Sequence, residues 1–175
     1  MRIKAFNFFL TISLILSACV PEKQPNPTIL GIEFGSSYED AWSMLFHRFN
    51  SRAMERTNGY ISVNPVELGN FEFDYGNFRF QTKGYESYLS EVELVSHFGD
   101  DKEGALEFEQ ELGNMLRVKY KDFGIYYNKD GKKRYKFGVN PKDDKEPLGV
   151  LGVDDKNNVF LIYGPIYYIP KSSDF

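Results

Sequence analysis

The sequence predicts an α+β domain, in which an antiparallel sheet carries two helices packed on one face. Two segments repeat apolar side chains at a 3.6-residue period, which is typical of helices that bury one side. Other segments alternate apolar and polar residues, which is typical of half-buried antiparallel strands. The chain contains 16 Phe and 12 Tyr, and aromatic residues make up 17% of it. Aromatic side chains favour strands, so most of the domain is expected to be sheet.

The first helix is expected from about residue 37 to residue 50. Ser36 and Glu39 form a capping box, and Ser37 is an alternative N-cap. The apolar face that follows consists of Tyr38, Ala41, Trp42, Leu45 and Phe49. This spacing predicts a helix that packs on the sheet.

Three strand-like runs follow, at residues 59–68, 71–81 and 87–98. In the second run the phase of the aromatic residues changes at Gly76–Asn77, which predicts a tight turn or a bulge. In the third run Leu89 is out of phase with the apolar residues after it. Together the runs predict an antiparallel meander.

The second helix is expected within residues 100–122, with Asp100 as its N-cap and Glu103 in the capping-box position. Its apolar face consists of Phe108, Leu112, Met115, Leu116 and Tyr120. Gly104 and Gly113 each weaken a helix by about 1 kcal/mol relative to Ala, but the periodicity persists through them.

The last part of the chain predicts two pairs of strands. Asp130–Gly131 lies between two aromatic-rich arms and predicts a hairpin with a type I′ turn. Residues 141–147 are expected to be a polar loop. Residues 148–170 predict two further strands around a turn near Asp154–Asn158.

The N-terminus has the order of a signal peptide. Arg2 and Lys4 form a short basic region, an apolar run covers residues 5–16, and small residues lead to the single cysteine, Cys19. The run is too short for a membrane-spanning helix, which needs about 20 apolar residues. We therefore expect residues 1–18 to be a signal peptide.

The stretch Leu16-Ser17-Ala18-Cys19 resembles the lipobox of bacterial lipoproteins. The resemblance implies cleavage before Cys19 and attachment of a lipid carrying palmitate-type acyl chains to its thiol. Such an anchor holds a protein stably when two or three acyl chains enter the membrane. Val20, in place of an Asp, implies the outer membrane by the sorting rules of that family. The alternative is an ordinary signal peptide that ends near a cysteine by chance.

Residues 19–30 are expected to form the lipidated Cys and a tether. Pro21, Pro25 and Pro27 favour an extended conformation, which reaches roughly 30 Å at about 3.1 Å per residue. Residues 31–175 are then expected to be a single α+β domain. With its only cysteine acylated, the domain has no thiol for a disulfide, a nucleophile or a metal site.

The segment Ile32–Ala41, IEFGSSYEDA, resembles the start of small envelope lipoproteins of the SmpA/OmlA kind and of the beta-lactamase-inhibitor-protein fold. In those folds a Gly–x–Ser turn begins a first helix, a second helix follows, and a sheet packs on both. Here three predicted strands separate the two helices. The whole chain also resembles lipoproteins of gut bacteria. These resemblances imply a setting in the cell envelope and carry over no functional residue except Cys19.

No catalytic, cofactor-binding or metal-binding set is expected. The two histidines, His47 and His97, have no nucleophile or metal-ligand spacing around them. The formal charge of −4 is unsuited to binding nucleic acid. With 25 acidic residues, paired carboxylates are unavoidable, so an envelope hydrolase that uses them is the alternative function.

The leading expectation is a lipid-anchored interaction domain, anchored through Cys19, that binds a protein or a glycan. A basic, tyrosine-rich hairpin is the candidate surface, because exposed Tyr side chains favour interfaces. The candidate residues are Tyr126, Tyr127, Lys132, Lys133, Arg134 and Tyr135. The alternative is that this hairpin is only a solvated turn.

Overall fold

The computed structural model describes residues 26–50, 53–57 and 59–167. These residues form two helices, α1 (Tyr38–Phe49) and α2 (Lys102–Lys119). The strands of the main sheet are β3 (Met54–Thr57), β4 (Tyr60–Val63), β7 (Tyr75–Lys83), β8 (Glu86–His97), β9 (Phe123–Tyr127), β10 (Lys133–Asn140), β11 (Asp143–Val153) and β12 (Asn158–Tyr163). Two short hairpins pair β1 (Thr28–Ile29) with β2 (Ile32–Glu33) and β5 (Val66–Leu68) with β6 (Phe71–Phe73).

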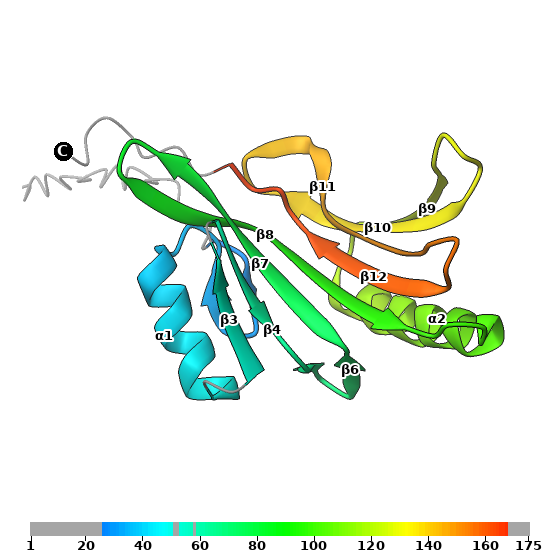
Figure 1. The fold of residues 1–175 in the computed structure, drawn as a ribbon. Helices are drawn as coiled ribbons and strands as arrows, with labels where there is room; N and C mark the ends of the chain where they lie inside the picture. Colours follow the sequence, from blue (N-terminus) through cyan, green and yellow to red (C-terminus); the bar gives the residue numbers. More distant parts are fainter. Residues whose placement is uncertain (1–25, 51–52, 58, 168–175) are drawn as a thin grey trace, which may run out of the picture.

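The main sheet is antiparallel throughout and has the order β3-β4-β7-β8-β12-β11-β10-β9. Figure 1 shows α1 and α2 below the sheet, under its two halves. The predicted α+β class, with two helices on one face, is therefore confirmed.

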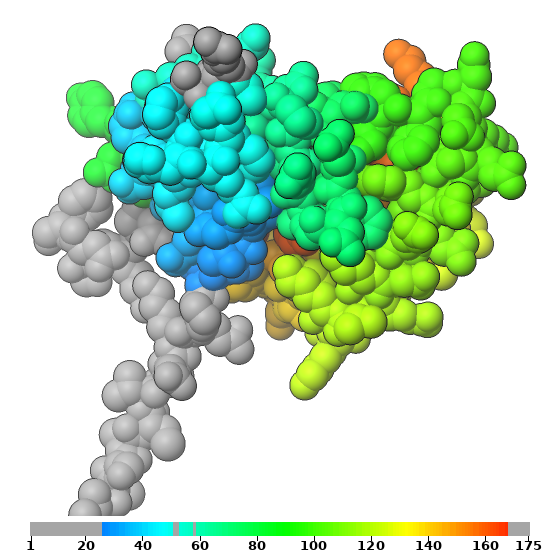
Figure 2. All heavy atoms as spheres, turned by 90° about the horizontal axis from the view of Figure 1, so that it is seen from below, coloured from blue at the N-terminus to red at the C-terminus, as the bar shows by residue number. Residues whose placement is uncertain are grey.

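The core lies between that face and the helices. Cross-strand partners share a face of a sheet, and the pairs run from one half to the other: Ile61 with Phe78, Leu94 with Leu161, and Leu161 with Leu151. All five of these side chains are fully buried. Seen from below, α1 in cyan and α2 in green cover this face, with the β5–β6 hairpin between them (Figure 2).

Both helices begin close to the predicted positions. Ser37, the alternative cap, is the N-cap of α1, and its Oγ accepts a hydrogen bond from Asp40 N at 3.1 Å. The predicted cap of α2, Asp100, is wrong by one residue, because Asp101 accepts the bond from Gly104 N at 2.9 Å. A Cβ at Gly104 would overlap an Asp101 carboxylate oxygen, so this glycine leaves room for the cap.

The predicted turn or bulge at Gly76–Asn77 is wrong. The strands are interrupted two residues earlier, at Asp74, and β7 runs without interruption through Gly76. Gly76 lies in the core, where a Cβ would be 2.8 Å from Leu94 Cδ2, so it is selected by packing rather than by a turn. The phase change seen at Leu89 is a real β-bulge, because Arg79 pairs with Glu91 and the next residue of β7 pairs with Leu89.

The β9–β10 hairpin forms where predicted, but with a longer connection than a type I′ turn. Residues 128–132 join the strands, and Gly131 N donates to Asn128 O at 2.9 Å. Gly131 has a φ of +74°, whereas Asp130 does not have a positive φ. This is a type I turn followed by a left-handed glycine, and the Asn128 side chain stabilises it by accepting from Asp130 N and Lys132 N.

Two predicted boundaries also move. Residues 141–147 are not a loop, since β11 starts at Asp143 and most of the segment is strand. Ile29 is 3% exposed and belongs to the core, so packed structure begins inside the predicted 19–30 tether. Cys19 and residues 1–18 lie outside the described residues.

Candidate functional site

Strand β9 forms one edge of the main sheet and pairs with β10 alone among the described strands. At its two ends Gly138 N donates to Asp122 O and Asn128 N donates to Lys132 O, so its even-numbered residues bond to β10. Backbone groups alternate in direction along a strand. The residues whose N–H and C=O groups face the open edge are therefore Phe123, Ile125 and Tyr127.

The side chains of the same three residues form an apolar row. Ile125 pairs with Tyr135 and Tyr127 pairs with Lys133, so the row lies on the face that carries α2. Ile125 is 56% exposed and Tyr127 is 69% exposed. The row therefore extends beyond the part of the sheet that α2 covers. We call Phe123, Ile125 and Tyr127 the edge row.

A groove of about 460 Å³ separates the edge row from α2. Its α2 wall includes Gln110, Asn114 and Arg117, and its sheet wall includes Ile125, Lys133 and Tyr135. The guanidinium of Arg117 lies 6.0 Å from the centre of the Phe123 ring. The groove thus combines apolar side chains with amide and cationic groups.

A buried acid lies beside this groove. Glu109 of α2 is 3% exposed, and its Oε2 lies 3.7 Å from Lys133 Nζ. Lys133 Nζ also donates a hydrogen bond to Tyr135 Oη. Burial raises the pKa of Glu109, and the charges of Lys133 and Arg134 only partly oppose this. Burial tends to lower the pKa of Lys133, but the Tyr135 hydroxyl and the Glu109 charge raise it above its ordinary value.

The raised pKa values of Glu109 and Lys133 arise from one ion pair whose two members differ in burial. The carboxylate is almost fully buried, whereas the Lys133 side chain is 43% exposed. Glu109 therefore bears most of the desolvation that opposes its charged form. Lys133 is the ion that compensates this buried charge and joins α2 to β10.

The predicted hairpin residues do not form one patch. Alternation places Tyr127, Lys133 and Tyr135 on the α2 face, and Tyr126 and Arg134 on the opposite face. Lys133 and Tyr135 come together with Glu109, as described above.

Arg134 and Lys132 are both engaged within the protein. The guanidinium of Arg134, a residue only 8% exposed, donates to the carbonyls of Lys133 and Val153 and lies 5.0 Å from the Phe160 ring centre. Lys132 forms an ion pair with Asp155. The positive charge of the hairpin is thus partly used to hold the fold together.

Several site residues were not found from the sequence. Glu109 follows Ala105 by four residues and precedes Leu112 by three, so its place on the buried side of the helix was visible in the spacing. The role of Ile125 was not visible, because nothing local distinguishes an edge strand from a central one.

Carboxylates that could serve a hydrolase are held by neighbouring side chains. Glu91 and Glu93 both bind Arg79, at 2.5 and 2.6 Å. Asp74 accepts from His97 N at 2.6 Å and lies 3.0 Å from the imidazole Nδ1. These pairs provide structural reasons for the carboxylates.

A larger cavity, of about 690 Å³, lies elsewhere, between the β10–β11 hairpin and residues 164–167. Its buried polar side chain, Asn140, donates to Pro165 O at 2.9 Å and accepts from Lys142 N at 3.0 Å. Both ends of that amide therefore serve the fold rather than a ligand.

No protein-family model, no curated protein and no solved structure matches this chain. The inference about function therefore depends on the geometry described above.

Within residues 26–50, 53–57 and 59–167, no group of three or more His, Cys, Asp or Glu side chains could hold a metal ion. In the same part of the chain, neither helix has the length and apolar character needed to cross a membrane.

Proposed function

We propose that this protein is a lipid-anchored interaction domain of the bacterial outer membrane that binds a protein partner by strand addition at β9. In this mode an extended segment of the partner hydrogen-bonds to a sheet edge, and its alternate side chains enter neighbouring pockets. The observation that carries the proposal is the edge row, which joins open backbone groups, exposed apolar side chains and an adjacent groove.

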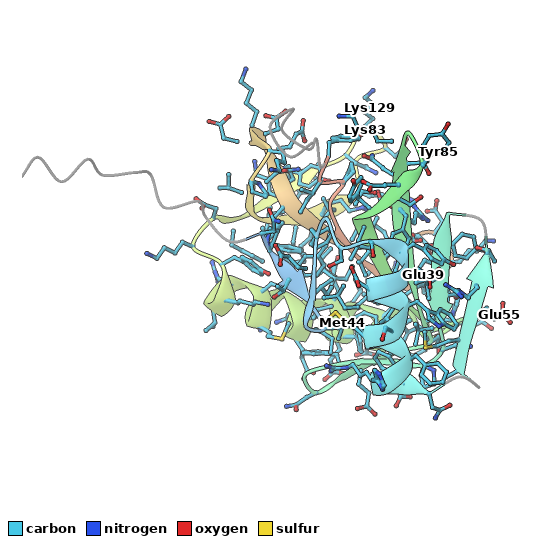
Figure 3. The ribbon with its side chains drawn as sticks, turned by 90° about the vertical axis from the view of Figure 1, so that its left-hand side faces the viewer. Glu39, Met44, Glu55, Lys83, Tyr85 and Lys129 are labelled. Carbon is cyan, nitrogen blue, oxygen red and sulfur yellow. The ribbon has the colours of Figure 1, made fainter. Side chains whose placement is uncertain are left out.

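The strand at the opposite edge of the sheet, β3, is protected by charged side chains, whereas β9 is not. Soluble proteins commonly protect edge strands with charged side chains. Strand β3 carries Glu55, which projects outward in Figure 3, and Arg56, which pairs with Glu39 of α1 at 2.7 Å. Strand β9, with the sequence FGIYY, carries no charged side chain. A protein strand is favoured over a glycan because this edge presents a row of open backbone N–H and C=O groups, which an extended chain can pair in register.

Replacing Ile125 by Lys should weaken partner binding at least about tenfold. The change removes apolar contact area worth about 1.5 kcal/mol and places a charge in the edge row. A photo-crosslinking residue at position 127, introduced into the protein with and without the Ile125→Lys change, measures the partner captured in cells. The Ile125→Lys change should abolish the crosslink.

The matched control is Tyr85→Lys, at the fully exposed tip of the β7–β8 hairpin, away from the body in Figure 3. It should leave the crosslink from position 127 intact. A partner crosslinked there should also slow amide exchange at Ile125. Equal capture by all variants, with no slowed exchange, would show that β9 is not the binding edge.

Replacing Cys19 by Ser should release the protein from membranes. The lipid cannot then be attached, and the remaining chain has no acyl group to insert. Fractionation should move most of the protein from the membrane pellet to the soluble extract. Ser17→Ala keeps a small residue in the lipobox and should stay in the pellet. A Cys19→Ser protein that still pellets would contradict the anchor.

A further inference from the structure

The charges around the edge row are predominantly positive on the groove side. Arg117 lies over Phe123, and Lys133 contributes a second cation whose side chain is 43% exposed. Two further lysines, Lys121 and Lys129, flank β9 two residues beyond either end of the row. Lys129 projects from the hairpin tip in Figure 3.

These cations have few carboxylate partners in the fold. Arg117, Lys121 and Lys129 form no ion pair within the described part of the chain. Glu109 is buried and already faces Lys133. Asp122 lines a separate hollow with Gly124 and Lys136, residues of the opposite face.

We infer that the segment received by β9 is an extended acidic strand, with three alternate apolar residues between two flanking carboxylates. This inference rests on the proposed strand addition. In an antiparallel register centred on Ile125, the apolar positions oppose the edge row. The flanking carboxylates then lie near Lys121 and Lys129, which adjoin the two ends of β9.

A second copy of this chain fits the edge less well. Symmetric pairing of β9 with itself places Ile125 opposite Ile125, but it also brings Lys121 of one copy near Lys129 of the other at both ends. Like charges brought close together oppose such a pairing. The unpartnered cations therefore favour a partner strand of opposite charge.

Two synthetic peptides test the inference. The first is Asp-Ser-Val-Thr-Val-Thr-Val-Ser-Asp with blocked ends, and the second replaces both Asp residues by Lys. With the detergent-solubilised full-length protein at low salt, the acidic peptide should bind about tenfold more tightly, because its two carboxylates lie near Lys121 and Lys129, where the second peptide places like charges. The difference should shrink at high salt, since exposed charges are screened. Amide exchange at Phe123, Ile125 and Tyr127 should slow in the complex.

Reversing the charges at Lys121 and Lys129 tests directly whether these two lysines cause the preference for the acidic peptide. The double variant Lys121→Glu with Lys129→Glu should reverse the preference and favour the lysine peptide. Lys83→Glu, at the β7–β8 tip shown in Figure 3, is the matched control and should leave the preference unchanged.

The outcomes separate this inference from the proposed function. Equal slowing of edge exchange by both peptides would overturn the acidic preference and leave strand addition standing. Failure of both peptides to slow it would overturn the acidic inference, and the crosslink from position 127 would then decide strand addition separately. A concentration-dependent dimer that protects β9 without peptide would also overturn it, because a second copy would then occupy the edge.

Discussion

Replacing Phe137 by Ala should lower the free energy of unfolding by about 4 kcal/mol, the range found when a buried Phe is truncated. Phe137 is fully buried, and its ring centre lies 5.0 Å from those of Tyr120 and Tyr163. The backbone is shaped around this ring, since a Cβ at Gly149 would overlap it. Because Phe137 pairs with Phe123, its loss also loosens the edge row.

Urea unfolding followed by circular dichroism measures this change. Val139→Ala, two residues along the same strand and 47% exposed, is the matched control and should change the free energy of unfolding by less than about 1 kcal/mol. A Phe137→Ala protein as stable as this control would contradict the role of the ring in the core.

Replacing Lys133 by Met should lower the free energy of unfolding by about 2 kcal/mol. The change leaves the Glu109 carboxylate buried without its cation, which costs about 3–5 kcal/mol in fully buried pairs. The expected loss is smaller here because the Lys133 side chain is 43% exposed and water replaces part of its contribution. The combined Glu109→Leu and Lys133→Met variant should recover most of the loss, since the buried charge has gone.

The loss should depend on pH in a defined direction. Burial raises the pKa of Glu109 above the ordinary value of 4.5, so the folded protein binds this proton more tightly than the unfolded chain does. Ionised Glu109 therefore opposes folding above its folded pKa, and this effect is relieved as pH falls from that pKa toward the ordinary range.

Removing Lys133 raises the pKa of Glu109 further. The deficit of Lys133→Met should thus be largest at neutral pH and shrink as the pH is lowered. The same substitution made in a Glu109→Gln background should show a deficit that does not vary over the pH range in which the deficit shrinks with Glu109 present. A pH-independent deficit in the Glu109 background would contradict the pairing.

The helices and most strands of this protein could be predicted from local sequence patterns. The 3.6-residue periods predicted α1 and α2 within a few residues, and the phase change at Leu89 corresponded to a bulge in β8. The helix predictions succeeded because periodicity is a property of one segment. The bulge itself was not predicted at Leu89, and the turn or bulge predicted at Gly76–Asn77 was wrong. The caps and turns were less accurate, because neighbouring Asp or Ser residues can each accept the same backbone bond, as Asp100 and Asp101 show.

The order of the strands in the sheet could not be predicted from the sequence. β12, the last of the described strands, inserts between β8 and β11, which leaves β9 at an edge. Such long-range pairing depends on which complete faces bury best together, and no local pattern records it. The same pairing separated the predicted hairpin residues onto two faces, engaged Arg134 and Lys132 inside the fold, and brought Glu109 of α2 to Lys133. The candidate site is thus a consequence of strand order, because the order alone exposes the backbone of Phe123, Ile125 and Tyr127.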